Sequence, residues 1–337
     1  MNQCKNNLDI AYNTGLSFLT SPRMLFQILN IVGPVFLVIG SGYTLIRLGF
    51  FPDDLTDALM KFAVQLAVPC LLFRATSRLD LGSAYDWRVM LSFYSGASIS
   101  FFLAAYSAWK FFGRTPGESV AVGFSALFSN SVLLGLPISE RAWGADNLST
   151  AYAIISIHAP FCYLLGITSM EVIRSDGRTW RATLTVVLRA MFRNSLMIGI
   201  GLGFLANLSG VDLPVVLSSA VDILSDSALP IALFALGGIL TRYHIAADLG
   251  QIGTISLFSL IVHPLLTLLL CQLLQVDPMV ARTAVLIAAM APGINSYLFA
   301  TLYQRGQHIA ASTVLLATAS SVVSVSAWLW LLTKLYQ

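Results

Sequence analysis

Charged side chains are scarce in this sequence. Only 10% of its 337 residues are Asp, Glu, Lys or Arg, and 57% are hydrophobic, whereas charged residues make up about 25% of a typical soluble domain. This composition excludes a soluble globular protein. The net charge of +3 is too small to indicate a surface that binds nucleic acid. The sequence therefore predicts an all-α polytopic membrane protein whose surroundings are the lipid bilayer.

Cysteine motifs and catalytic signatures are missing as well. Cys4, Cys70, Cys162 and Cys271 form no C-x-x-C pair, so we expect neither a disulfide framework nor a metal site. The sequence has no G-x-S-x-G and no H-E-x-x-H motif, which ranks an intramembrane hydrolase far below other interpretations. We expect no enzyme activity and no cofactor.

About ten segments are apolar over roughly the 20 residues that a membrane-spanning helix needs. Arg189 and Arg193 leave the sixth segment an apolar core of residues 195–208 only. Residues 1–24 lack the pattern of a secretory signal and form an N-terminal extension. The predicted spans are residues 25–46, 57–76, 88–111, 118–140, 149–171, 184–208, 215–240, 251–275, 279–303 and 308–334.

Two of these spans contain residues that interrupt membrane helices. They combine an Asn-Ser pair with glycine and proline, and Asn130 precedes Asn295 by 165 positions. Paired interruptions at matching places in two halves of a chain indicate the binding site of a secondary transporter. The residues concerned are Ser129, Asn130, Ser131, Gly135 and Pro137 in the fourth span, and Pro292, Gly293, Asn295 and Ser296 in the ninth.

A second correspondence between the halves lies in the second and seventh spans. AVPCLLF around Pro69 matches ALPIALF around Pro230 at a similar offset of 161 positions. The sequence thus predicts two five-helix repeats, residues 25–174 and 175–337. An odd number of spans in each repeat inverts the second relative to the first. Basic residues cluster between the repeats, which favours both termini outside.

Broken helices free backbone N–H and C=O groups, which a membrane protein tolerates only inside protein or beside a watery cavity. If the two broken spans cross, their half-helix N-termini favour an anionic group. The amides of Asn130 and Asn295 and the hydroxyls of Ser129, Ser131 and Ser296 could then bind a carboxylate. The alternative is that these small polar residues only pack helices together, but their matched occurrence favours the site.

Ionisable residues inside spans are further candidates. Lys61 follows Asp57 by four residues, a spacing that predicts an ion pair. The candidates for proton coupling are Asp222, Asp226, His158 and His263, although the aspartates could equally form a solvated helix entrance and the histidines could be simple helix contacts. Trp328 and Trp330 near the C-terminus fit an interfacial belt.

Three stretches resemble a known family. FSNSVLLGLPI (residues 128–138), ALPIALFALGG (228–238) and APGINSYLFATLY (291–303) are similar to signatures of the auxin efflux carrier family, which includes bacterial anion permeases and plant PIN-type carriers. The resemblance covers residues 25–335. The short connection between the fifth and sixth spans favours a bacterial-type permease.

The resemblance implies ten spans, crossing helices 4 and 9, and a substrate carboxylate bound by Asn130 and Asn295. It also implies an elevator-like movement and a possible homodimer. We therefore expect a plasma-membrane carrier, such as one in a bacterial inner membrane, for small organic anions: malate, malonate or an auxin-like acid. The alternatives are a sodium-coupled symporter with the related bile-acid-symporter fold and a membrane sensor that binds the anion without moving it.

Overall fold

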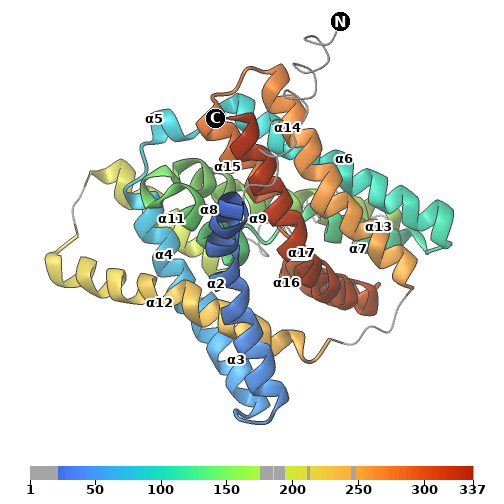
Figure 1. Cartoon of the computed structure of the whole chain (residues 1–337). Helices are drawn as coiled ribbons and strands as arrows, with labels where there is room; N and C mark the ends of the chain where they lie inside the picture. Colours follow the sequence, from blue (N-terminus) through green and yellow to red (C-terminus); the bar gives the residue numbers. More distant parts are fainter. Residues whose placement is uncertain (1–21, 175–184, 186–193, 211–212, 244–247, 337) are drawn as a thin grey trace, which may run out of the picture.

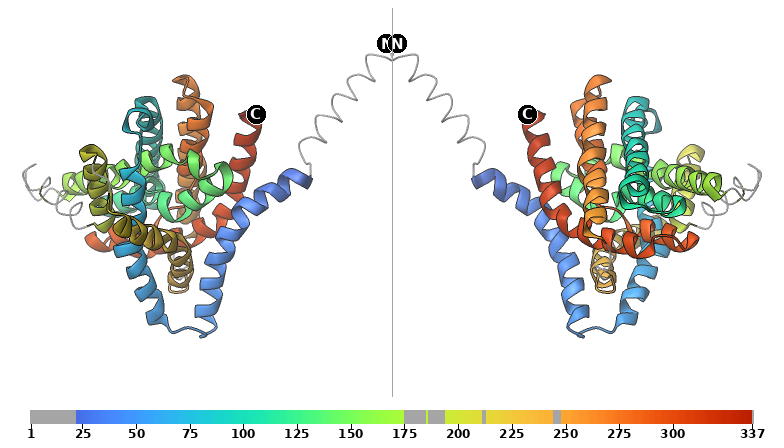
Figure 2. Two further views of the ribbon diagram at one scale, coloured as in Figure 1. Left: turned by 90° about the vertical axis from the view of Figure 1, so that its left-hand side faces the viewer. Right: turned by 90° about the vertical axis from the view of Figure 1, so that its right-hand side faces the viewer.

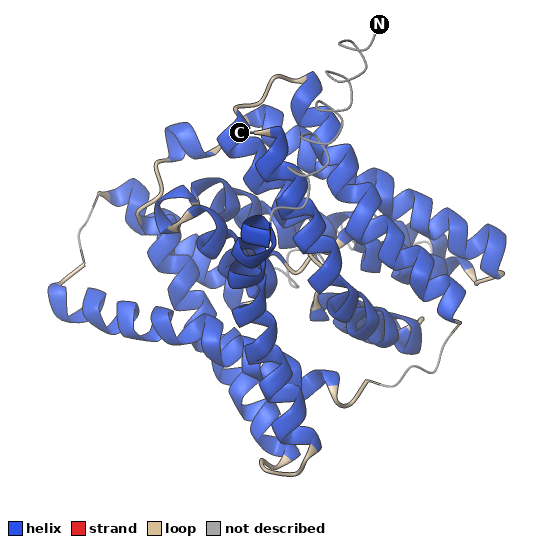
Figure 3. Cartoon of the chain, in the orientation of Figure 1, coloured by secondary structure: helices blue, strands red, loops and turns tan. Residues whose placement is uncertain are grey.

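The computed structural model describes residues 22–174, 185, 194–210, 213–243 and 248–336 (Figure 1). These residues form helices joined by short connections, and the described part contains one isolated β-bridge and no strand (Figure 3). Seven of the described helices are long and apolar enough to cross a membrane. The prediction of an all-helical, multi-span membrane protein is confirmed.

The described helices coincide closely with the predicted spans. Residues 1–21, most of the predicted N-terminal extension, lie outside the described residues, as does nearly all of the sixth span before residue 194. The single helices are α2 (Pro22–Arg47), α6 (Trp87–Phe112), α9 (Ser149–Arg174), α11 (Ser195–Ser209), α12 (Val215–Leu240) and α17 (Gln307–Leu335), with the short α5 (Leu81–Ala84). Two further segments contain a π-helical turn: α3 (Asp53–Phe62), η1 (Ala63–Ala67) and α4 (Val68–Ser77), and α13 (Leu249–Leu257), η4 (Phe258–Val262) and α14 (His263–Leu273).

The fourth and ninth predicted spans are broken, as predicted. The first consists of α7 (Pro116–Leu127), η2 (Ser131–Gly135) and α8 (Leu136–Trp143). The second consists of α15 (Pro278–Ala288) and α16 (Ile294–Tyr303). Residues 128–130 and 289–293 between these pieces are not helical.

Proline accounts for the π-helical turns. Pro69, Pro137 and Pro264 each stand at the second position of the α-helix that follows such a turn. A proline lacks an N–H and clashes with the carbonyl four residues earlier, so that carbonyl loses its normal partner. For Pro264 this is Leu260, whose oxygen accepts a hydrogen bond of 2.8 Å from Trp328 Nε1. Trp328 is buried among the helices, so it is not the lipid-facing residue that an interfacial belt requires.

The helices pack as two groups, which we call the α12 group (α2, α3, η1, α4, α11 and α12) and the α7 group (α6 to α9 and α13 to α17). In Figure 1 the α12 group lies toward the lower left and α6, α7, α13 and α14 toward the right. Figure 2 shows α2 and the α3–α4 segment as a hairpin that projects from the other helices. This division leaves the broken spans on one side of a boundary between the groups.

Glycines allow the helices of the α12 group to approach closely. A Cβ added at Gly42 of α2 would lie 2.0 Å from the carbonyl oxygen of Phe234 in α12, and one at Gly237 of α12 would lie 1.9 Å from that of Ile39. Gly199 of α11 likewise lies against the backbone of Pro69 in α4. Backbone contact through small residues is a usual way for membrane helices to associate.

Candidate functional site

The two broken spans meet at their breaks. The backbone N–H of Asn130 donates to the carbonyl oxygen of Ala291 at 2.8 Å, and the N–H of Gly293 donates to that of Phe128 at 3.0 Å. Ser129 and Pro292 form the isolated antiparallel bridge between these two hydrogen bonds. The breaks thus satisfy each other's backbone groups, as a membrane interior demands.

Two helix N-termini begin at this crossing. η2, which continues as α8, starts directly after Asn130, and α16 starts directly after Gly293. Unpaired N–H groups and the helix dipole make such termini favourable for negative charge. An anion placed at the crossing would therefore meet two partial positive charges.

The asparagine side chains keep their amide donors available. Asn130 Oδ1 accepts from the backbone N–H of Leu133 at 3.3 Å, and Asn295 Oδ1 accepts from the hydroxyl of Tyr163 at 3.3 Å. In both cases the oxygen is used and the NH2 group has no partner among the described residues. This orientation fits recognition of a carboxylate.

The small residues of the breaks have different roles. A Cβ at Gly135 would lie 2.7 Å from Ile287 Cδ1, so Gly135 lets η2 pack on α15. A Cβ at Gly293 would make only ordinary contacts with Asn130, at 3.5 Å or more. Pro137 follows the π-turn, and Pro292 lies in the bridge, where its missing N–H leaves the two flanking hydrogen bonds intact. These residues shape the break and offer no side-chain donor.

A cavity of about 560 Å³ opens from the crossing between the two groups of helices. Ser129 Oγ lies 3.4 Å from His158 Nε2 in its wall, and Cys162 Sγ contacts the same imidazole ring. Ser296 is fully buried outside the lining, and its hydroxyl has no hydrogen-bond partner in the described structure. The polar lining residues are Asp57, Lys61, Gln65, Ser129, Asn130, Ser131, His158, Tyr163, Asn194, Ser195 and Asn295.

The cavity also contains a charge arrangement that the sequence did not reveal. Asp57 Oδ1 lies 2.7 Å from Arg242 Nη1 at the end of α12, so the predicted ion pair between Asp57 and Lys61 is wrong. Lys61 forms no ion pair within the described residues, yet it lines the same cavity as both asparagines. Helical spacing suggested the local partner, whereas packing of α12 against α3 supplied a better one.

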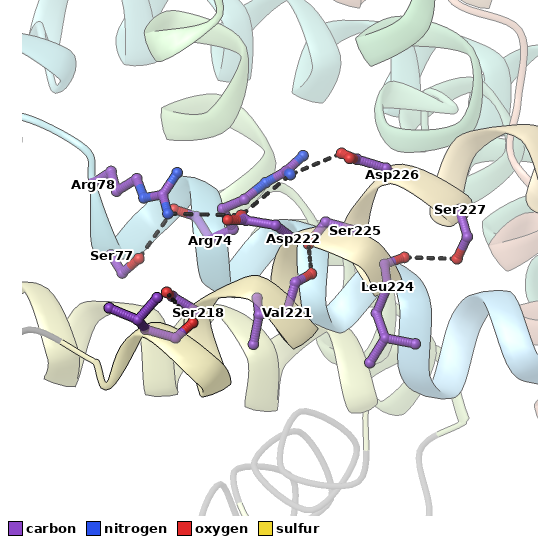
Figure 4. Close-up of polar contacts among 11 residues, drawn as sticks. Arg74, Ser77, Arg78, Ser218, Val221, Asp222, Leu224, Ser225, Asp226 and Ser227 are labelled. Atoms are coloured by element: carbon purple, nitrogen blue, oxygen red, sulfur yellow. Dashed lines mark hydrogen bonds and ion pairs between the residues drawn. The ribbon is translucent and has the colours of Figure 1, made fainter.

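Asp222 and Asp226 lie away from the crossing. On α12, they face α4, where Arg74 Nη1 lies 3.4 Å from Asp222 and 2.8 Å from Asp226 (Figure 4). Arg78 Nη2 lies 3.6 Å from Asp222. The pair is thus part of an ion-pair cluster within the α12 group, and its role in proton coupling stays a prediction.

The two histidines also differ in position. His158 lines the cavity, as described above. His263 is fully buried in α14, where Nε2 lies 3.3 Å from the carbonyl oxygen of Phe93 and the two rings are 5.0 Å apart. Only His158 is therefore placed next to a predicted substrate-binding residue, and proton transfer by either stays a prediction.

Multiple apolar spans, two broken helices and a polar cavity at their crossing define an integral membrane protein of the transporter class. Comparison with known proteins makes this specific, because the family described as "Membrane transport protein" matches residues 27–329. The chain belongs to this family, the auxin efflux carrier family that the motifs indicated. It is a family of transporters, not enzymes.

Similarity to individual relatives extends over almost the whole chain. A "Putative malonate transporter" of Rhizobium meliloti is 26% identical over 309 residues, which are 91% of this chain and 96% of the relative. An "Uncharacterized transporter" of Methanothermobacter thermautotrophicus is 22% identical over an alignment that covers 87% of this chain and 95% of the relative. The "Uncharacterized transporter YfdV" of Escherichia coli K12 is 22% identical over an alignment that covers 88% of this chain and 95% of the relative.

Proposed function

We propose that this protein is a secondary transporter of small organic anions. The observation that carries the proposal is the hydrogen-bonded crossing, where two asparagine amides and two helix N-termini face one cavity. Desolvating a carboxylate is unfavourable unless each oxygen regains partners. Asn130, Asn295, Ser129 and Ser131 supply such donors in the proposed site, and the buried Ser296 would support the wall behind it.

We propose dicarboxylates as the preferred substrates. The donors at the crossing would bind one carboxylate of the substrate. The ammonium of Lys61 lines the same cavity and is available for a second carboxylate, because Asp57 pairs with Arg242. An auxin-like monocarboxylate would leave Lys61 without a counter-charge. The name of the Rhizobium meliloti relative, a "Putative malonate transporter", agrees with a small dianion.

Alternating exposure would come from movement of the α7 group against the α12 group. The cavity lies between them, so a sliding, elevator-like displacement could carry the crossing and its substrate across the bilayer. The matching Asn-Ser and Pro motifs support ten spans in two inverted repeats, residues 25–174 and 175–337. The proposal also includes a location in the plasma membrane, such as a bacterial inner membrane, and assembly as a homodimer.

The test is uptake of labelled malonate, malate, succinate and indole-3-acetate into proteoliposomes containing the purified protein. Saturable uptake of the dicarboxylates is the expected result. Parallel runs with an imposed pH gradient and with a sodium gradient distinguish proton coupling from the sodium-coupled alternative. Ligand-dependent stabilisation without uptake would favour a sensor, and absence of both would contradict the organic-anion assignment.

A further inference from the structure

A second cavity, of about 540 Å³, lies between the same two groups of helices. The first cavity is lined by residues near the start of α3 and the end of α12, such as Asp57 and Ile239. The second is lined by residues in the second half of α4 and the middle of α12, such as Arg74 and Ser225. The two cavities therefore lie at different positions along the same helices.

The crossing opens onto the first of these cavities. The non-helical residues 128–130 and 289–293 do not line the second one, although Pro137, further along the fourth span, does. Leu72 lines the first cavity, Leu71 and Leu136 line the second, and all three side chains are buried. In this state Asn130 and Asn295 line the first cavity and not the second.

Beside the second cavity, α8 is hydrogen-bonded to α2 through Arg141. Arg141 Nη2 donates to the carbonyl oxygen of Asn30 at 2.7 Å, and Arg141 Nε donates to that of Ile31 at 3.0 Å. α8 belongs to the α7 group and α2 to the α12 group, so these bonds cross the boundary. Arg141 also lines the second cavity, together with Pro34.

Pro34 explains why α2 can accept these bonds. Within a helix the carbonyl of Asn30 would bond the N–H four residues later, which belongs to Pro34 and does not exist. The proline lies inside α2 and so leaves one carbonyl free. A guanidinium presents two N–H donors in a rigid fork that can bond neighbouring carbonyls together.

We propose that Arg141 is a conformational latch between the two groups of helices. It holds α8 against α2 while the crossing is open to the first cavity, and it must release α2 before the crossing can open to the second. An elevator-like displacement moves α8 along α2, away from Pro34, which is the one proline inside α2. The inference rests on the proposed alternating movement but does not depend on the substrate.

The test measures access to each cavity by cysteine labelling. In a background with Cys4, Cys70, Cys162 and Cys271 replaced by serine, Gln65→Cys reports on the first cavity and Val38→Cys on the second. Both single-cysteine proteins are reacted with a small water-soluble maleimide in proteoliposomes. The quantity of interest is the ratio of the two labelling rates.

Arg141→Ala is expected to raise labelling at Val38→Cys and lower it at Gln65→Cys, which changes the ratio about tenfold, equivalent to about 1.4 kcal/mol. Pro34→Ala restores the missing N–H and should change the ratio in the same direction by a smaller factor. Adding Pro34→Ala to Arg141→Ala should produce little further change, because both act on one contact. Arg141→Lys, which loses the fork, should give an intermediate ratio.

Arg78→Ala is the matched control. This arginine lies at the same end of the molecule but pairs with Asp222 inside its own group, so its removal should leave the ratio unchanged. An unchanged ratio in a folded Arg141→Ala variant would overturn the latch, and so would a parallel rise at both cysteines, which indicates general loosening. Because labelling needs no substrate, these outcomes are independent of the uptake experiment.

Discussion

The backbone N–H of Asn130 donates a hydrogen bond of 2.8 Å to the carbonyl oxygen of Ala291. This bond connects the broken spans of the two halves of the chain and fixes the distance between the backbones that carry Asn130 and Asn295. Because the contact is made by backbone atoms, it persists when either side chain is replaced. Substitutions of the asparagines therefore change the donors of the site and leave the crossing in place.

Asn130→Ala and Asn295→Ala are each expected to abolish most transport. Each removes an amide donor to the proposed carboxylate, and a lost hydrogen bond to a charged group is worth about 1.5–3 kcal/mol, or about ten- to hundredfold in binding. The measurement is initial uptake in proteoliposomes, with the melting temperature as a check on folding. Asn147→Ala, on the exposed η3 turn (Ala145–Asn147), is the control, and wild-type rates in both site variants would contradict the proposal.

Lys61→Gln is expected to weaken dicarboxylate transport more than monocarboxylate transport. We expect the KM for malonate to rise about tenfold, since one charged hydrogen bond in a partly hydrated cavity contributes about 1–2 kcal/mol. The KM for a monocarboxylate should change little. Lys110→Gln, at the end of α6 and outside the cavity lining, tests for a general charge effect; equal loss for both substrate classes would exclude a role in selectivity.

His158→Gln is expected to remove the acceleration of uptake by a pH gradient while substrate exchange continues. Glutamine can replace the hydrogen bond to Ser129 but cannot take up a proton. Asp226→Asn should retain the acceleration, because Asp226 pairs with Arg74 away from the crossing. The two variants are compared in the same liposomes with and without the gradient. The reverse result would assign proton coupling to the aspartates.

Gly42→Ala is expected to destabilise the protein. The added Cβ would lie 2.0 Å from the carbonyl oxygen of Phe234, so α2 and α12 must separate, at a cost of about 1–3 kcal/mol. Gly40→Ala is a close control in the same helix, since nothing lies within 4 Å of its added Cβ. Thermal unfolding in detergent should show a lower midpoint for Gly42→Ala only. Equal midpoints would mean that close packing of α2 against α12 at Gly42 does not contribute to stability.

Much of the fold follows from local sequence patterns. The predicted spans match the described helices because a bilayer requires long apolar segments, and hydropathy records this requirement directly. The breaks near Asn130 and Asn295 were recognisable because glycine and proline act on the backbone within a few residues.

Other features were missed because they depend on segments distant in the chain. The spacing of Asp57 and Lys61 indicated a local ion pair, but Arg242 reaches Asp57 from the end of α12. Tryptophan is a residue type common in interfacial belts, but Trp328 is buried. Its indole N–H donates to the carbonyl oxygen of Leu260, which Pro264 leaves without its usual helical partner. Neither partner can be recognised from the sequence around the residue itself.

The sequence by itself determined that this protein spans a membrane, where its two special helices break and which asparagines stand at the breaks, since hydropathy and backbone restriction are local properties. Only the tertiary structure decided that both breaks share one crossing, that Lys61 and Tyr163 join the asparagines at one cavity, and that Arg141 bonds α2 beside Pro34. The physical reason is that helix rotation and helix pairing are set by packing between segments far apart in the chain.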